Sequence, residues 1–152
     1  MEFRLLQAYE PLPMELLLEA DPSERLVRAY CAVGWCMIGE QEGSVIGVCV
    51  LLVLSDSTIE IKNLAVAESF RGQGYGRRLL QHALAEALHR NFQFVEIGTG
   101  NSSMDQLAFY QKCGFRFHAI DSDFFIRNYP EPIFENGIEC RDMIRLRYTI
   151  NN

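Results

Sequence analysis

The chain has 152 residues, of which 49% are apolar and 22% charged, and it carries a formal net charge of −6. This composition predicts one globular domain, residues 1–152, and excludes disordered, collagen-like and coiled-coil chains; the acidic balance also argues against nucleic acid as a partner. The longest apolar run, residues 45–54, is too short to cross a bilayer, and no signal-peptide pattern opens the chain, so we expect a cytoplasmic protein without a membrane partner.

The first half of the chain predicts mostly strands. A helical segment, residues 14–30, follows a short strand, and Asp21-Pro22 breaks it, with Asp21 as the expected cap of the second part. Two apolar runs separated by a polar turn at Gly43 predict a hairpin. In chain order, the expected strands are 3–7, 35–41, 45–54 and 58–66.

The second half alternates helices with strands. We expect helices at 74–90 and 103–113, and strands at 94–98, 115–120 and 143–150. Strands followed by strands, and then strands alternating with helices, indicate an α/β or α+β domain with a mixed sheet.

Two helices carry local signals. Leu79, Leu80 and Ala83 begin an apolar stripe of helical period that continues to Leu88, so this helix packs on a sheet. Gly114 stands where a left-handed C-terminal cap belongs, which places Tyr110 in the last turn of the other helix.

The strand at 58–66 changes its alternation. Its apolar positions are Ile59 and Ile61, and then Leu64 and Val66. Side chains alternate strictly along a strand, so the switch predicts a β-bulge near Asn63, unless the strand is buried on both faces and its alternation carries no meaning. A bulge would leave backbone groups available to a ligand.

A glycine-rich loop follows this strand and opens the next helix. Gly72, Gly74 and Gly76 let successive N–H groups converge on an anion at a helix N-terminus, which predicts a pyrophosphate cradle. Arg71, Arg77 and Arg78 add positive charge, and no acid occurs between residues 69 and 85. The glycine spacing fits neither a P-loop nor a dinucleotide-binding fingerprint.

Three stretches together resemble the motifs of the GNAT superfamily of N-acetyltransferases. They are residues 61–66 (IKNLAV), 70–80 (FRGQGYGRRLL) and 109–115 (FYQKCGF), and the similarity covers about residues 44–118. The resemblance implies a single domain with a mixed, mostly antiparallel sheet of about seven strands, splayed at a bulged fourth strand, with helices on both faces. It implies acetyl-CoA as cosubstrate and leaves residues 119–152 as the acceptor side.

The resemblance also implies a cofactor site. The backbone of Leu64, Ala65 and Val66 would pair with pantetheine, and the N–H groups of the loop would hold the pyrophosphate. Asn101 or Ser103 would bond the pantetheine, although Ser103 could instead be only a helix cap. The loop residues implied are Arg71, Gly72, Gln73, Gly74, Tyr75, Gly76 and Arg77.

Three groups would carry the chemistry that the resemblance implies. Tyr110 would protonate the leaving thiolate as general acid, and an N–H near Val66 would stabilise the oxyanion. Relatives often have an acid where this chain has Lys62 and Asn63, so Glu60 is the nearest candidate for the general base. A salt bridge of Glu60 with Lys62 or another neighbour is the alternative.

The acceptor is an unidentified primary amine, and the chain would act as a monomer or homodimer. Acidic and aromatic residues crowd the C-terminal third, where Phe125, Tyr129 and Phe134 are candidates to line the amine site. A non-catalytic acyl-CoA binding or sensing module and a phosphate-binding module for another nucleotide are the competing hypotheses.

Other chemistry-bearing residues predict no further site. The five cysteines form no Cys-x-x-Cys pair and are expected to be reduced, packed thiols. His82, Glu86 and His89 share one helix face, but that face is polar and solvated, so we expect no metal.

Overall fold

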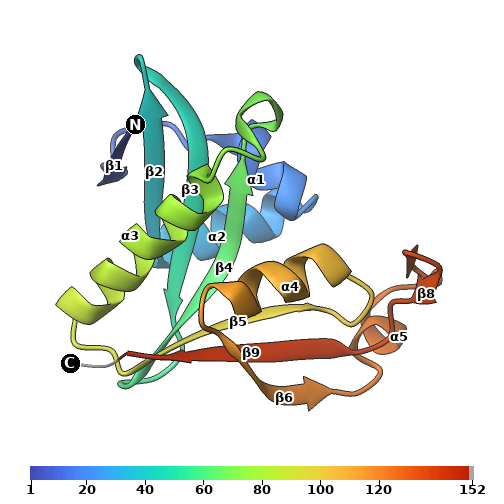
Figure 1. The fold of residues 1–152 in the computed structure, drawn as a ribbon. Helices are drawn as coiled ribbons and strands as arrows, with labels where there is room; N and C mark the ends of the chain where they lie inside the picture. The colour runs from blue at the N-terminus through green and yellow to red at the C-terminus, as the bar shows by residue number, and fades with distance from the viewer. Residues whose placement is uncertain (151–152) are drawn as a thin grey trace. The chain divides into compact units, whose positions relative to one another are not determined.

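The computed structural model describes residues 1–150, which fall into two compact units, Met1–Gln93 and Phe94–Asn152. The mixed α/β class with about seven main strands and a mostly antiparallel arrangement is confirmed (Figure 1). No helix among residues 1–150 is long and apolar enough to cross a membrane.

The first unit contains four antiparallel strands in the order β1-β2-β3-β4. The hairpin turn predicted at Gly43 is confirmed, with Glu42 and Gly43 both at positive φ (52° and 81°), as a tight turn between β2 and β3 requires. The strands are β1 (Glu2–Leu5), β2 (Trp35–Gln41), β3 (Ser44–Val53) and β4 (Thr58–Val66).

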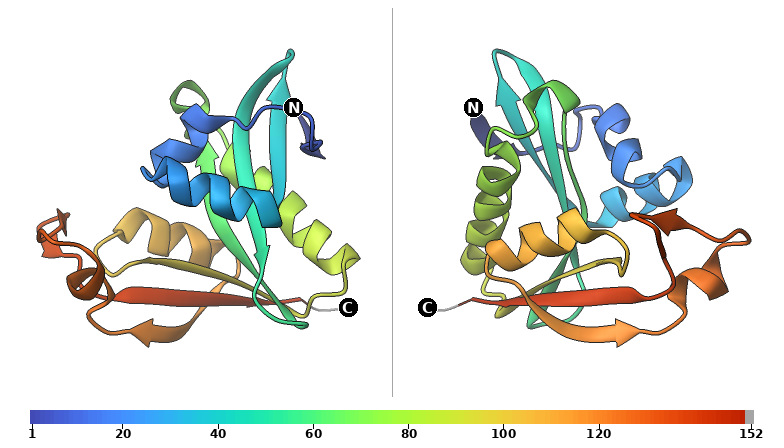
Figure 2. Two further views of the ribbon diagram at one scale, coloured as in Figure 1. Left: turned by 180° about the vertical axis from the view of Figure 1, so that it is seen from behind. Right: turned by 45° about the vertical axis from the view of Figure 1, so that its right-hand side comes forward.

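Helices cover both faces of this four-stranded sheet, as the two views of Figure 2 show. Leu17 packs with Val48 in the core under α1 and α2, whereas a Cβ placed on the neighbouring Gly47 would lie 3.1 Å from Leu79 of α3. Successive β3 residues therefore face opposite helices, as strand geometry demands. The helices are α1 (Met14–Ala20), α2 (Glu24–Val33) and α3 (Tyr75–His89), with a 3₁₀ turn, η1 (Glu68–Phe70), before α3.

Two local expectations for these helices need correction. The chain does break between α1 and α2, but the cap of α2 is Ser23, whose side chain accepts a hydrogen bond from the Leu26 N–H. Asp21 ends α1 instead and accepts a hydrogen bond from the Ser23 N–H. On α3, Leu88 closes the predicted apolar stripe but is 44% exposed, although the preceding Ala87 is fully buried.

The predicted β-bulge is confirmed in β4. Asn63 lies opposite Val50, but Ile61 lies opposite Leu51, so Lys62 is the extra residue. Val50 and Leu52 both contact the core under α1 and α2, and Glu60 lies opposite Leu52. The bulge therefore lets Glu60 and Asn63, three residues apart, share the face of β4 that α1 and α2 cover.

The second unit has three antiparallel strands in the order β5-β9-β6 and a separate β7-β8 hairpin. The predicted C-cap is confirmed, because Gly114 has φ +99° and Phe115 N–H donates to the Tyr110 carbonyl after the last turn of α4. The elements are β5 (Phe94–Gly100), α4 (Met104–Lys112), β6 (Arg116–Asp121), α5 (Phe124–Asn128), β7 (Phe134–Glu135), β8 (Ile138–Glu139) and β9 (Met143–Thr149).

Candidate functional site

The glycine-rich loop forms an exposed helix start in the first unit. Gly72 and Gly74 have φ of +75° and +84°, and a Cβ at either would meet nothing within 4 Å. Gly74 is the N-cap of α3 and no side chain caps it. The first N–H groups of a helix have no partner within the helix, so the start of α3 presents donors and partial positive charge to an anion.

The loop side chains are held by the protein around this helix start. Arg71 donates from Nε to the Val66 carbonyl at 2.9 Å and from Nη2 to Glu19 Oε2 at 2.6 Å. Gln73 bonds the Ser69 carbonyl, and the Tyr75 hydroxyl donates to Gln41. Arg77 is exposed. Arg71 thus ties the loop to β4, and Arg77 projects into solvent beside the helix start.

The end of β4 offers backbone groups on one side. Ala67 N–H donates to the Ile46 carbonyl of β3 at 2.8 Å. Along an antiparallel strand, backbone N–H groups point alternately toward the partner strand and away from it. Ala65, opposite Val48, therefore also forms hydrogen bonds with β3, whereas the N–H groups of Leu64 and Val66 point away from β3. Of the three predicted backbone positions, Leu64 and Val66 have the orientation that a ligand lying along β4 requires.

Buried polar groups lie on the α1/α2 face of β4. Glu60 is 7% exposed and Asn63 is 4% exposed. Asn63 Nδ2 donates to the Tyr30 hydroxyl, which in turn donates to Asp21. Burial raises the pKa of Tyr30 to about 12, so its hydroxyl keeps its proton at neutral pH and serves both bonds.

Tyr110 belongs to the second unit, where it is 6% exposed in α4. Its ring makes edge contacts with Phe109 and Phe115, with centroids 5.2 and 5.8 Å away, and Phe115 packs on Tyr148. These aromatic contacts fix the direction of the Tyr110 ring.

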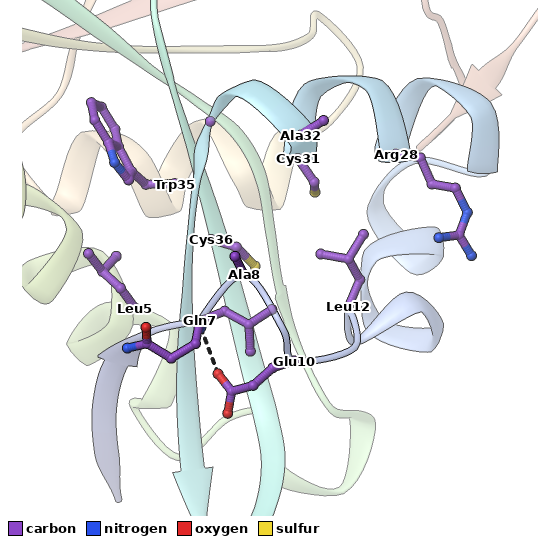
Figure 3. A pocket seen from close by; sticks show the side chains of 12 residues that line it. Leu5, Gln7, Ala8, Glu10, Leu12, Arg28, Cys31, Ala32, Trp35 and Cys36 are labelled. Carbon is purple, nitrogen blue, oxygen red and sulfur yellow. Dashed lines mark hydrogen bonds between the residues drawn. The ribbon is translucent and has the colours of Figure 1, made fainter.

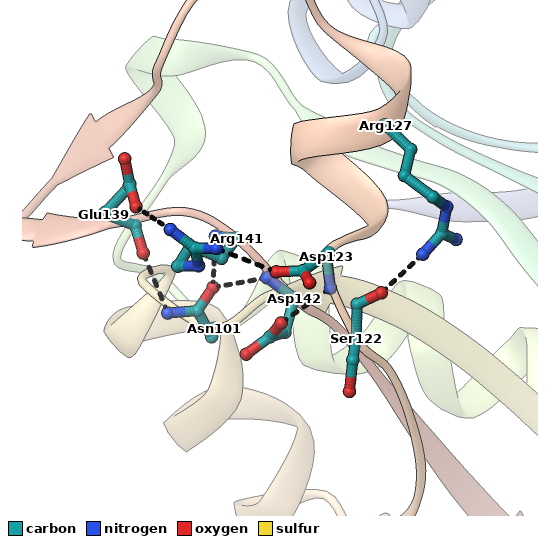
Figure 4. Close-up of polar contacts among 7 residues, drawn as sticks. All are labelled: Asn101, Ser122, Asp123, Arg127, Glu139, Arg141 and Asp142. Atoms are coloured by element: carbon teal, nitrogen blue, oxygen red, sulfur yellow. Dashed lines mark hydrogen bonds and ion pairs between the residues drawn. The ribbon is translucent and has the colours of Figure 1, made fainter.

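Asn101 and Ser103 flank the start of α4 and both form hydrogen bonds within the second unit; Figure 4 shows those of Asn101. Asn101 Oδ1 accepts from the N–H groups of Arg141 and Asp142, and its Nδ2 donates to the Glu139 carbonyl. Ser103 does not cap α4 with its side chain; its hydroxyl donates to Glu135 at 3.0 Å. Asn101 thus clamps the segment that joins β8 to β9.

The β7-β8 hairpin, which supplies Glu135, is not among the elements predicted from the sequence. Glu135 Oε1 also accepts from the Ser102 hydroxyl, and Asn136 donates to the Ser102 carbonyl. Asn136 and Gly137 both have positive φ, and the Asn-Gly pair is a strong hairpin signal that would have found this element.

The three aromatic acceptor candidates are brought together only in part. Phe125 in α5 and Tyr129, which follows the last residue of α5, stack with ring centroids 5.7 Å apart. Phe134 stands on β7 and is 64% exposed. Several acids of this region are paired. Arg127 binds Asp121, and Arg141 binds both Asp123 and Glu139, as Figure 4 shows for Arg141.

A pocket of about 550 Å³ in the first unit lies apart from every predicted site residue (Figure 3). The connection between β1 and α1, the end of α2 and the start of β2 line it. Burial raises the pKa of both of its thiols, Cys31 and Cys36, the latter to about 12. These thiols stay protonated, so the pocket holds no activated nucleophile.

The cysteines and histidines build no site of their own within residues 1–150. None of the five cysteines there forms a disulfide, and no group of three His, Cys, Asp or Glu residues is arranged to hold a metal. His82 stacks on Phe3 of β1 with ring centroids 4.0 Å apart, so it has a packing role.

Comparisons with known proteins agree with these features. The family model described as Acetyltransferase (GNAT) family matches residues 3–115. The uncharacterized N-acetyltransferase YvbK of Bacillus subtilis is 51% identical over 132 residues, which are 87% of this chain and 85% of YvbK. A GNAT family acetyltransferase from Elizabethkingia anophelis, solved with acetyl-CoA bound, is 45% identical with a TM-score of 0.93 and covers 98% of this chain and 97% of its own. An acetyltransferase of B. subtilis, solved in complex with CoA, is 45% identical with a TM-score of 0.91 and covers 98% of both chains.

Proposed function

The chain belongs to the GNAT family of acetyltransferases, which use acetyl-CoA as cosubstrate, and we propose that it acetylates a primary amine by direct attack in a ternary complex. The observation that carries this proposal is the uncapped start of α3 close to the end of β4, where the N–H groups of Leu64 and Val66 point away from β3. We place the reaction in the cytoplasm, where cysteines remain reduced, because none of the five cysteines in residues 1–150 forms a disulfide.

Acetyl-CoA would be held by backbone groups. The N–H groups from Gln73 to Arg77 would bind the pyrophosphate, and Leu64 and Val66 would pair with the pantetheine amides. The side chain of Arg77 would add a full charge beside the phosphates. Arg71 already bonds Glu19, so its contribution is to hold the loop against β4.

The proposed reaction has three linked steps. The lone pair of the neutral amine attacks the thioester carbon, and the new C–N bond leaves charge on the oxygen, which the N–H near Val66 stabilises. The C–S bond then breaks, and Tyr110 gives its proton to the departing thiolate. The attacking nitrogen loses a proton to Glu60, directly or through water, so no acetyl-enzyme forms.

The acceptor side is proposed to lie in the C-terminal third. Phe125 and Tyr129 form a stacked apolar surface, and Phe134 is an exposed aromatic side chain on β7. Such a surface suits an amine that carries an aromatic or apolar group. Replacement of Phe134 by Ala provides a direct check, since it should raise the KM of such an amine selectively.

Thiol release from acetyl-CoA tests the proposed function. We would measure it with 2-phenylethylamine, spermidine and a peptide with a free N-terminus. Turnover with at least one amine supports the proposal. Tight CoA binding without turnover on any amine would instead favour the non-catalytic acyl-CoA module, and a melting temperature raised by ATP or NAD but not by CoA would favour a different nucleotide.

Replacement of Gly74 by Ala is expected to weaken CoA binding about tenfold, the effect of losing one charge-assisted hydrogen bond. Gly74 has φ +84°, and an alanine there would shift the N–H groups that face the pyrophosphate. The measurement is the Kd of CoA by calorimetry.

Gly43 offers a matched control for this loop. It has φ +81° and equally open surroundings, but it lies in the β2–β3 turn. Both alanine variants should lose a similar amount of stability, whereas only Gly74→Ala should lose CoA affinity. Equal CoA affinities for the two variants would contradict the placement of pyrophosphate at this loop.

A further inference from the structure

Asn63 is anchored by both helices that cover its face of β4. Its Nδ2 donates to the Leu17 carbonyl of α1 at 3.0 Å and to the Tyr30 hydroxyl of α2 at 3.0 Å. The Tyr30 hydroxyl donates onward to Asp21 Oδ2 at 3.2 Å. A backbone carbonyl can only accept, so the contact with Leu17 fixes which end of the amide is Nδ2.

The other end of the Asn63 amide has no partner. Among residues 1–150, Asn63 Oδ1 is the one buried side-chain oxygen or nitrogen that makes no hydrogen bond. An unpaired buried carbonyl costs folding free energy, and native proteins rarely keep one without a role. Because the bond from Nδ2 to the Leu17 carbonyl sets which way the amide faces, Oδ1 cannot turn to find a partner of its own.

The position of Asn63 connects this oxygen with the proposed chemistry. The bulge at Lys62 puts Asn63 and Glu60 on the same face of β4, and the next residue is Leu64, whose N–H points away from β3. An amine that gives its proton to Glu60 and attacks a thioester held along Leu64–Val66 must approach over this face. Ala65, the next side chain on it, is small and packs beside the core under α1 and α2.

We propose that Asn63 Oδ1 accepts a hydrogen bond from the attacking amine and so orients its lone pair toward the thioester. This inference rests on the proposed acetyl transfer. A neutral primary amine has two N–H bonds, one of which is lost to the base while the other bonds Asn63. Oδ1 is buried here, so side chains on the α1/α2 face move when the amine binds. Asn63 then favours primary over N-methylated amines.

Three variants separate this role from a structural one. Asn63→Leu removes both ends of the amide at similar volume, and Asn63→Asp keeps an acceptor oxygen while removing the donor. Tyr30→Phe is the matched control, because it breaks one Nδ2 bond and leaves Oδ1 intact. The probe is the panel amine with the highest kcat/KM, compared with its N-methyl derivative, at pH 8.

We expect Asn63→Leu to raise the KM of the primary amine about tenfold, equivalent to about 1.4 kcal/mol, with the KM of acetyl-CoA unchanged. Its preference for the primary over the N-methyl amine should fall. Asn63→Asp should retain the amine KM despite a lower melting temperature, and Tyr30→Phe should lower only the melting temperature.

Two outcomes would overturn the inference. The first is that the wild type turns over and Asn63→Leu keeps the wild-type amine KM and the wild-type preference for the primary amine. The second is that Asn63→Asp and Asn63→Leu lose amine affinity and this preference to the same extent. In either case Asn63 has a structural role and the proposed function stands. Absence of wild-type turnover on every amine overturns the inference together with the proposed function.

Discussion

Tyr110→Phe is expected to lower kcat at least about 100-fold while the Kd of CoA stays within a factor of two, since general acid catalysis contributes about 10²–10⁴-fold. The variant removes the proton donor but keeps the ring, whose contacts with Phe109 and Phe115 hold it in α4. A thiolate that leaves without a proton raises the barrier to C–S cleavage. Steady-state kinetics and CoA calorimetry on the same preparation measure the two effects.

Tyr148→Phe is the matched control for this variant. Tyr148 packs on Phe115 in the same group of rings, so its replacement also deletes a hydroxyl from this part of the second unit. Tyr148→Phe should keep the wild-type kcat. If Tyr110→Phe keeps it as well, Tyr110 is not the general acid, and water must protonate the thiolate.

Local signals predicted the elements of this fold well. The alternation switch between Ile61 and Leu64 predicted the bulge, which the structure places at Lys62. Gly114 predicted the end of α4, and its φ of +99° agrees. These features follow from side-chain period and glycine conformation, which adjacent residues determine.

Partners that are distant in the chain could not be predicted in the same way. Asn63 bonds Leu17 and Tyr30 across 46 and 33 positions, and Asn101 binds the 139–142 segment across about 40. The side-chain amide of asparagine can both donate and accept hydrogen bonds. The residue type alone therefore does not indicate the partner, which depends on the residues that the fold brings close to it. For this reason the contacts of Asn101 with the 139–142 segment could not be predicted from the sequence.

The bulge in β4 is a local feature that determines which distant residues Asn63 can contact. It adds one residue to β4 and so brings Glu60 and Asn63 onto a common face, where α1 supplies the Leu17 carbonyl and α2 supplies Tyr30. Without it, strict alternation would put the two side chains on opposite faces of the sheet. The sequence thus predicts the bulge that brings these polar groups together, but it does not predict the hydrogen-bond partners of those groups.

Glu60→Gln is expected to lower kcat/KM for the amine by at least about 100-fold at pH 7, because it removes the group proposed to take the amine proton. The loss should be present at every pH measured, because the proposed base is absent from the variant throughout. A rise of kcat/KM with pH that the variant retains belongs to deprotonation of the amine itself. The measurement is kcat/KM from pH 6 to 9, with the melting temperature recorded at each pH.

Glu96→Gln is the control for this variant, because Glu96 is a buried carboxylate with a structural role. Glu96 is also buried, at 8% exposure, and it accepts hydrogen bonds from Arg145 and Arg147. Burial alone would raise its pKa, but these arginines outweigh that effect and lower it, so Glu96 stays charged. Glu96→Gln should therefore lower the melting temperature and leave kcat/KM for the amine unchanged at each pH. If Glu60→Gln gives that same result, Glu60 stabilises β4 as an ion-pairing residue, and water takes the proton from the attacking amine.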